Sequence, residues 1–182
     1  MAAGVQYLAL LRGINVGGKN PVKMSELRDG LEEIGLTDVA TYINSGNAVF
    51  RAPRQPRAEL AKRLEAELTR KFGIELRLVL LTHAQLRRVA KEAPRGFGAE
   101  TERCDVIFLF APLTVKRAVA AMETKEGVDR LWAGTGVVYF SRLTEKATSS
   151  RMGRVIAKPE YQDMTIRSWG TVTKLLALME RG

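Results

Sequence analysis

The residues of this chain best suited to binding an anion lie in a glycine-rich segment near the N-terminus. Arg12 precedes this segment, which contains the consecutive glycines Gly17 and Gly18 and is followed closely by Lys19. Backbone N–H groups in glycine-rich turns can point toward an anion, and the two basic side chains add positive charge. This combination predicts a site for a phosphate or carboxylate group.

Two predicted elements position this segment. The apolar run Val5–Leu11 predicts a strand, and a helical pattern begins near Met24. The helix N-terminus adds partial positive charge beside the loop. The connection is about ten residues long, whereas most connections have ~4–6, and this excess favours a functional loop.

A second polar segment, Asn44–Asn47, lies between two short predicted strands, Val39–Ile43 and Ala48–Arg51. In a β-α-β-β-α-β unit the first two strands are parallel and end at one edge of the sheet, so loop and turn are predicted to share a rim. The alternative is that these asparagines and glycines simply form turns. The predicted ligand-binding residues of the rim are Arg12, Gly13, Asn15, Gly17, Gly18, Lys19, Asn20, Asn44, Ser45 and Asn47.

The rest of the first half completes that unit. Leu60, Leu64, Leu68 and Phe72 recur every four residues and predict a helix that ends at Gly73. The segment Glu75–Leu81 then alternates as a fourth strand. The order β-α-β-β-α-β is that of the ferredoxin-like fold.

The second half repeats this order more loosely. Thr114 is a predicted helix N-cap, the basic stretch Thr144–Arg154 leads into a short predicted helix, and Gly170–Glu180 predicts a closing helix. The predicted strands are Asp105–Phe110, Val128–Trp132, Val137–Ser141 and Met164–Arg167. The sequence therefore predicts an α+β protein of two ferredoxin-like halves, residues 1–82 and 83–182, packed together with a C-terminal helix.

Several predicted strands are apolar on both faces, although helices cover only one face of an isolated split unit. Leu8 and Leu10 lie opposite Tyr7 and Ala9, and Val106–Phe110 is apolar throughout. Packing of the two halves against each other is the economical explanation, and a homodimer is the alternative.

Composition narrows the class of protein. The 182 residues carry a net charge of +9 from 19 arginines and 10 lysines, which favours nucleic acid or another phosphate-bearing partner. Basic residues beside acids on solvated helix faces are the alternative source of this charge. No apolar run reaches the ~18 residues of a membrane span, and no signal pattern opens the chain, so we expect a cytoplasmic protein without membrane contact.

A second basic segment lies between Lys146 and Lys158. Its hydroxyl groups and its arginines Arg151 and Arg154 are suited to phosphate contacts, although a solvated loop explains them equally well. Arg167 and Trp169 complete the predicted binding residues. For Trp169 the alternative is packing rather than base stacking.

The sequence gives little support for a nucleophilic cysteine, a metal site or a Walker-type NTPase. Cys104 is the only cysteine and opens an apolar strand, which predicts an inert core thiol. The single histidine, His83, follows a predicted N-cap, Thr82, so neither a metal site nor a cofactor is predicted. The loop approaches a Walker phosphate motif, but Asn20 stands where that motif has serine or threonine and Pro21 interrupts its helix.

The segments LLRGINVGGKN (Leu10–Asn20), TYINSGN (Thr41–Asn47) and TIRSWGTVTKL (Thr165–Leu175) resemble the uncharacterised bacterial domain-of-unknown-function family 1697. Ser168 and Gly170 depart from the asparagines expected in the last segment. The resemblance spans nearly the whole chain. It implies a fold of two ferredoxin-like parts and implies no activity.

The leading hypothesis is a binding protein for a nucleic acid or nucleotide. The rival is an enzyme acting on a small phosphorylated or carboxylated substrate at the same rim, with Lys19 or Ser45 supplying the chemistry. A third interpretation is an interaction module whose loop only braces the two halves.

Overall fold

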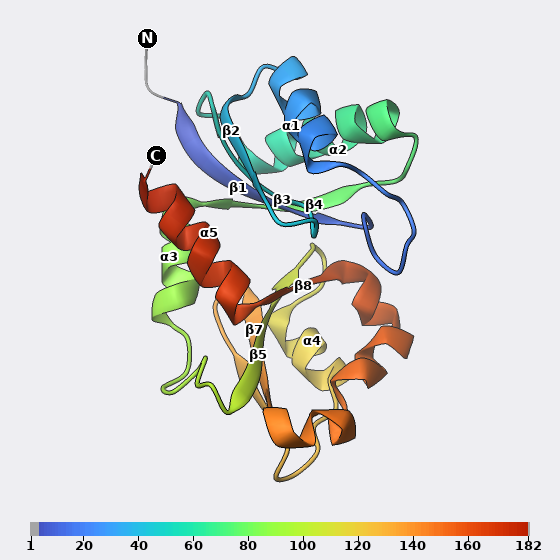
Figure 1. The fold of residues 1–182 in the computed structure, drawn as a ribbon, viewed down its shortest axis with the longest axis vertical. Helices are drawn as coiled ribbons and strands as arrows, with labels where there is room; N and C mark the ends of the chain where they lie inside the picture. The colour runs from blue at the N-terminus through green and yellow to red at the C-terminus, as the bar shows by residue number, and fades with distance from the viewer. Residues whose placement is uncertain (1–3, 182) are drawn as a thin grey trace. The chain divides into compact units, whose positions relative to one another are not determined.

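A computed structural model describes residues 4–181 of the chain. Its packing divides the chain into two compact units, one containing residues up to Gln85 and those from Leu175 onward, the other Leu86–Lys174. Each unit holds one four-stranded antiparallel sheet (Figure 1). Among residues 4–181, no helix has the length and apolar character needed to cross a membrane.

The first unit has the strand order β2-β3-β1-β4, in which every neighbouring pair is antiparallel. This arrangement confirms the predicted β-α-β-β-α-β unit. Its elements are β1 (Val5–Arg12), α1 (Met24–Glu33), β2 (Thr37–Tyr42), β3 (Asn47–Ala52), α2 (Arg57–Phe72) and β4 (Arg77–Thr82).

Helices α1 and α2 lie together on one face of this sheet (Figure 1). Leu60, Leu64 and Leu68 are fully buried against that face, as their spacing of four predicts. Each such leucine contributes roughly 1.5–3 kcal/mol by leaving water. Leu8 and Leu10, on the opposite face of β1, are also fully buried. Apolar side chains are therefore buried on both faces of β1.

The second unit repeats the strand order, as β6-β7-β5-β8. Helices α3 (His83–Lys91) and α5 (Trp169–Arg181) each span the division between the units. The remaining elements are β5 (Glu102–Leu109), α4 (Val115–Ala121), β6 (Asp129–Ala133), β7 (Val137–Leu143) and β8 (Met164–Ser168). Both sheets thus have the predicted ferredoxin-like topology.

The segment before β8 differs from the prediction of one short helix. Three 3-10 helices occupy it: η1 (Thr144–Ser149), η2 (Met152–Ala157) and η3 (Pro159–Asp163). Gly153 and Pro159 are poor helix formers, and the Ser150 hydroxyl accepts the Met152 N–H at 3.1 Å, so the chain breaks into short turns.

The ends of helices α4 and α1 show how local residues start and stop a helix. The Thr114 hydroxyl accepts the Arg117 N–H at 3.3 Å and so caps α4, as predicted. At the end of α1 the C-cap is Ile34, and Gly35 follows it with φ of 90°.

Candidate functional site

The glycine-rich loop is a small hairpin at the end of β1. The Lys19 N–H donates to the Val16 carbonyl at 3.0 Å, and these two residues form a β-bridge. Gly17 and Gly18 occupy the turn between them with φ of 58° and 74°. Positive φ at both central residues is typical of the type I′ turn, which glycine adopts without strain. The tip of the loop is therefore exposed backbone flanked by Lys19.

The Asn15 side chain braces this hairpin. Its Nδ2 donates to the Val22 carbonyl at 2.9 Å, and its Oδ1 accepts the Val22 N–H at 2.8 Å. The same Nδ2 donates to the Asn44 carbonyl at 2.8 Å. This last bond joins the loop to the β2–β3 turn. The two segments meet at one edge of the sheet, as the topology predicts.

Asn20 closes the base of the loop. Its Nδ2 donates to the Gly13 carbonyl at 2.8 Å, and its own carbonyl accepts the Asn15 N–H at 3.1 Å. Asn15 and Asn20 have φ of 53° and 51°, a left-handed conformation that asparagine tolerates well. The amide side chains of both residues thus serve the shape of the loop.

The β2–β3 turn packs against the same hairpin through a glycine. The Gly46 carbonyl accepts the Leu11 N–H at 2.8 Å, and Gly46 has φ of 77°. A Cβ at this position would lie 2.8 Å from Ile14 Cδ1 and 2.9 Å from Leu11 Cβ. Only glycine fits this close approach.

Asn47, a predicted ligand contact, is fully buried and so lies beneath the exposed surface of the rim. Its Nδ2 donates to the Tyr42 carbonyl and to the Ser45 hydroxyl, each at 2.9 Å. Asn47 therefore holds the turn from inside, whereas Asn44 and Ser45 are exposed on the rim.

An open cleft of about 610 Å³ lies beside the loop. Lys19 makes no ion pair with any residue that the structure describes, and Lys23 lies 3.8 Å from Glu26 in a pair of exposed side chains. Exposed pairs of this kind contribute little, so the cleft stays positive. The residues lining it are Asn15, Gly18, Lys19, Pro21, Val22, Lys23, Met24, Glu26 and Asn44.

Two aliphatic side chains, one in the loop and one in the β2–β3 turn, are exposed. Val16 is 67% exposed and Ile43 is 48% exposed, whereas Ile156 is the one other large apolar side chain so exposed among residues 4–181. Ile43 also has φ of 47°, an uncommon conformation for a β-branched residue and one that recurs at functional sites. Sequence reasoning missed both, although an isolated valine in a polar loop was a visible signal.

The predicted rim residue Arg12 is the last residue of β1 and lies opposite Arg77 of β4. Both Arg12 and its neighbour Gly13 are half-buried. They therefore lie at the foot of the loop rather than at its exposed tip.

The other predicted binding residues lie in the second unit. The Arg154 guanidinium lies 2.7 Å from the Glu123 carboxylate and, through that hydrogen bond, lowers the pKa of Glu123. The Arg151 guanidinium donates to the Thr124 carbonyl at 3.2 Å. Both arginines thus already have local partners.

Arg167 is 6% exposed, so it does not extend an exposed basic surface as predicted. Its guanidinium donates to the Thr165 hydroxyl and to the Ile166 carbonyl, each at 2.9 Å, and burial lowers its pKa to about 10. Trp169 packs edge-on against Phe97 with ring centroids 5.2 Å apart, a contact that favours packing as its role.

Cysteine and histidine side chains often perform catalysis, and here both have structural surroundings. Cys104 is 6% exposed, and burial raises the pKa of its thiol, as expected of a core cysteine. Thr82 and Gln85 cap the helix that begins at His83. In residues 4–181, no three histidine, cysteine, aspartate or glutamate side chains come together as a metal site would require.

Comparisons with known proteins agree with this fold. A solved structure of a conserved bacterial protein from Streptococcus pneumoniae is similar, with a TM-score of 0.82 and 29% sequence identity, covering 96% of this chain and 98% of that one. No curated protein matches the chain at a significant level. The model of the family described as protein of unknown function (DUF1697) matches residues 5–139, and the chain belongs to this uncharacterised bacterial family.

Proposed function

We propose that the rim formed by residues 13–23 and the β2–β3 turn binds a phosphate-bearing partner, a nucleotide or a nucleic-acid strand. One observation carries this proposal. At a single edge of the first sheet, the exposed lysines Lys19 and Lys23 line a cleft of about 610 Å³ whose lining also contains the apolar residues Pro21, Val22 and Met24. A ligand with a phosphate group and an apolar ring matches both kinds of surface.

The charged part of this surface suits the phosphates. Arg12, Lys19 and Lys23 fall within twelve residues that contain no aspartate or glutamate. A Cβ placed on Gly17 or Gly18 would meet nothing within 4 Å, so a ligand can approach the exposed backbone of the turn closely. The net charge of +9 adds long-range attraction for a polyanion.

The apolar part suits a base or a sugar. Pro21, Val22 and Met24 line the cleft. Two exposed side chains neighbour lining residues: Val16 pairs with Lys19, and Ile43 precedes Asn44. Aliphatic contacts of this kind tolerate any base, so we expect weak sequence preference and binding dominated by phosphate charge.

Fluorescence anisotropy with a labelled single-stranded oligonucleotide without terminal phosphates tests this proposal. Lys19→Gln should weaken binding several-fold and should lower the slope of log Kobs against log salt by about 0.7–1, the contribution of one lost phosphate contact. Lys62→Gln is the matched control, because Lys62 is an exposed lysine of α2 in the same unit and changes the net charge equally.

The two variants separate a local contact from general charge. Loss confined to Lys19→Gln supports the rim. Equal loss in both variants, or no measurable oligonucleotide binding at low salt, contradicts the proposal.

A further inference from the structure

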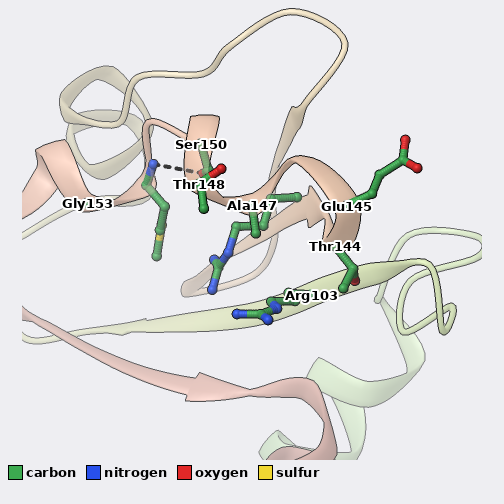
Figure 2. Close-up of a pocket in the computed structure, with 9 residues that line it drawn as sticks. Arg103, Thr144, Glu145, Ala147, Thr148, Ser150 and Gly153 are labelled. Atoms are coloured by element: carbon green, nitrogen blue, oxygen red, sulfur yellow. Dashed lines mark hydrogen bonds between the residues drawn. The ribbon is translucent and has the colours of Figure 1, made fainter.

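A second cavity, of about 570 Å³, lies in the second unit, at the edge of its sheet where β7 leads into η1 (Figure 2). Strands β5 and β7 form its floor and the 3-10 helices η1 and η2 its wall. Its lining is rich in guanidinium and hydroxyl groups. The lining residues are Arg103, Arg142, Thr144, Glu145, Ala147, Thr148, Ser150, Met152 and Gly153.

Two arginines of the floor are direct neighbours. Arg103 of β5 and Arg142 of β7 are partners in the antiparallel register, so their side chains share one face of the sheet. Like charges directly opposite each other in a sheet are destabilising. The two guanidinium groups therefore place positive charge together on one face of the sheet.

Only one of these arginines is neutralised by the protein. The Arg142 guanidinium lies 2.8 Å from the Asp105 carboxylate. Arg103 is exposed and forms no ion pair with any residue in the described range 4–181. The carboxylate of Glu145, the one acid in the lining, points away from the Arg103 guanidinium (Figure 2). The Arg103 guanidinium therefore lines the cavity as a positive charge without an ion-pair partner among the described residues.

Residues with hydroxyl groups form part of the wall of this cavity. Figure 2 shows Thr144 and Thr148 on the turn above Arg103. Their hydroxyls make no hydrogen bond to another described residue, and the Ser150 hydroxyl accepts the Met152 N–H and keeps its own proton to donate. Three hydroxyl groups thus line the same cavity as the Arg103 guanidinium, and hydroxyl donors suit the several oxygens of a phosphate group.

We propose that this cavity is a second, separate site that binds the phosphate group of a small phosphorylated molecule. The Arg103 fork donates two parallel hydrogen bonds to the phosphate oxygens, which a guanidinium does better than an ammonium group. The hydroxyls of Thr148 and Ser150 complete the contacts. The site does not depend on the rim, because all its residues belong to the second unit.

Isothermal titration calorimetry with inorganic phosphate, glucose 6-phosphate and glucose tests this site. We expect both phosphates to bind and glucose not to bind. Arg103→Gln should weaken phosphate binding at least tenfold, and Arg103→Lys should recover only part of it. Thr148→Val, which removes a hydroxyl at nearly constant volume, should weaken binding several-fold. The matched control is Arg87→Gln on the exposed part of α3, which should bind as the wild type does.

These titrations also show which part of the ligand is recognised, and the variants separate this site from the rim. Tighter binding of glucose 6-phosphate assigns a phosphomonoester, and equal binding assigns the phosphate group alone. Lys19→Gln should leave phosphate affinity unchanged, and Arg103→Gln should leave oligonucleotide affinity unchanged. Absence of phosphate binding at millimolar concentration, or equal affinity in Arg103→Gln and Arg87→Gln, overturns this inference and leaves the rim proposal standing.

Discussion

At the scale of single residues, the polar groups of the rim divide into those that shape it and those that face outward. The side chains of Asn15, Asn20 and Asn47 are committed to backbone carbonyls. Lys19 and Asn44 remain exposed. A loop held by its own amides needs little ordering when a ligand arrives, and less ordering means a smaller entropic cost of binding.

The need for glycine at position 46 can be measured as a loss of unfolding free energy on substitution. Gly46→Ala combines a left-handed φ with a Cβ 2.8 Å from Ile14, whereas Gly17→Ala has a left-handed φ and open space around it. We expect Gly17→Ala to cost about 1–2 kcal/mol of unfolding free energy from backbone strain alone. Gly46→Ala should cost about 1–3 kcal/mol more from overpacking.

Urea unfolding of both variants measures this difference. Equal costs would show that the turn does not pack on the loop as the structure has it.

At the scale of elements, most of the fold followed from periodicity and caps. The leucines of α2 recur every four residues, and Thr114 carries a side chain that caps α4, so local chemistry determined these helices. The region 144–163 was harder, because its 3-10 turns depend on Gly153, Pro159 and local hydroxyl bonds rather than on a repeated apolar pattern.

The candidate sites could likewise be predicted from the sequence only in part. The meeting of loop and turn was predictable, because parallel strand ends lie at one edge of the sheet. The pairing of Arg103 with Arg142 was not predictable, because it depends on the register of two strands far apart in sequence. The exposure of Ile43 also required the structure, since alternation alone placed this residue in a strand.

The loop itself is an element whose bracing can be tested. Asn15→Gly keeps the left-handed backbone available and removes three hydrogen bonds, so we expect a loss of about 1–3 kcal/mol of unfolding free energy. Amide exchange at Val22, which loses its acceptor, should become faster.

Asn44→Ala is the control, because the Asn44 side chain makes no hydrogen bond to any residue among those described. Its stability should stay within about 0.5 kcal/mol of the wild type. Unchanged exchange at Val22 in Asn15→Gly would mean that the brace does not hold the loop.

At the scale of the whole molecule, the two units share one strand order and carry different surfaces. The first presents lysines with exposed aliphatic side chains, and the second presents a paired arginine floor with hydroxyls. The net charge of +9 favours anionic partners for both. The shared topology therefore serves as a scaffold, and function follows from the loops at the sheet edges.

The central claim is that phosphate-bearing ligands bind at the rim, and NMR titration of the ¹⁵N-labelled protein tests it most directly. Adding the oligonucleotide without terminal phosphates should first shift the amide signals of Gly18, Lys19, Lys23 and Asn44. These shifts should diminish as the salt concentration rises. Shifts that appear only elsewhere in the chain, or none at low salt, would contradict the account.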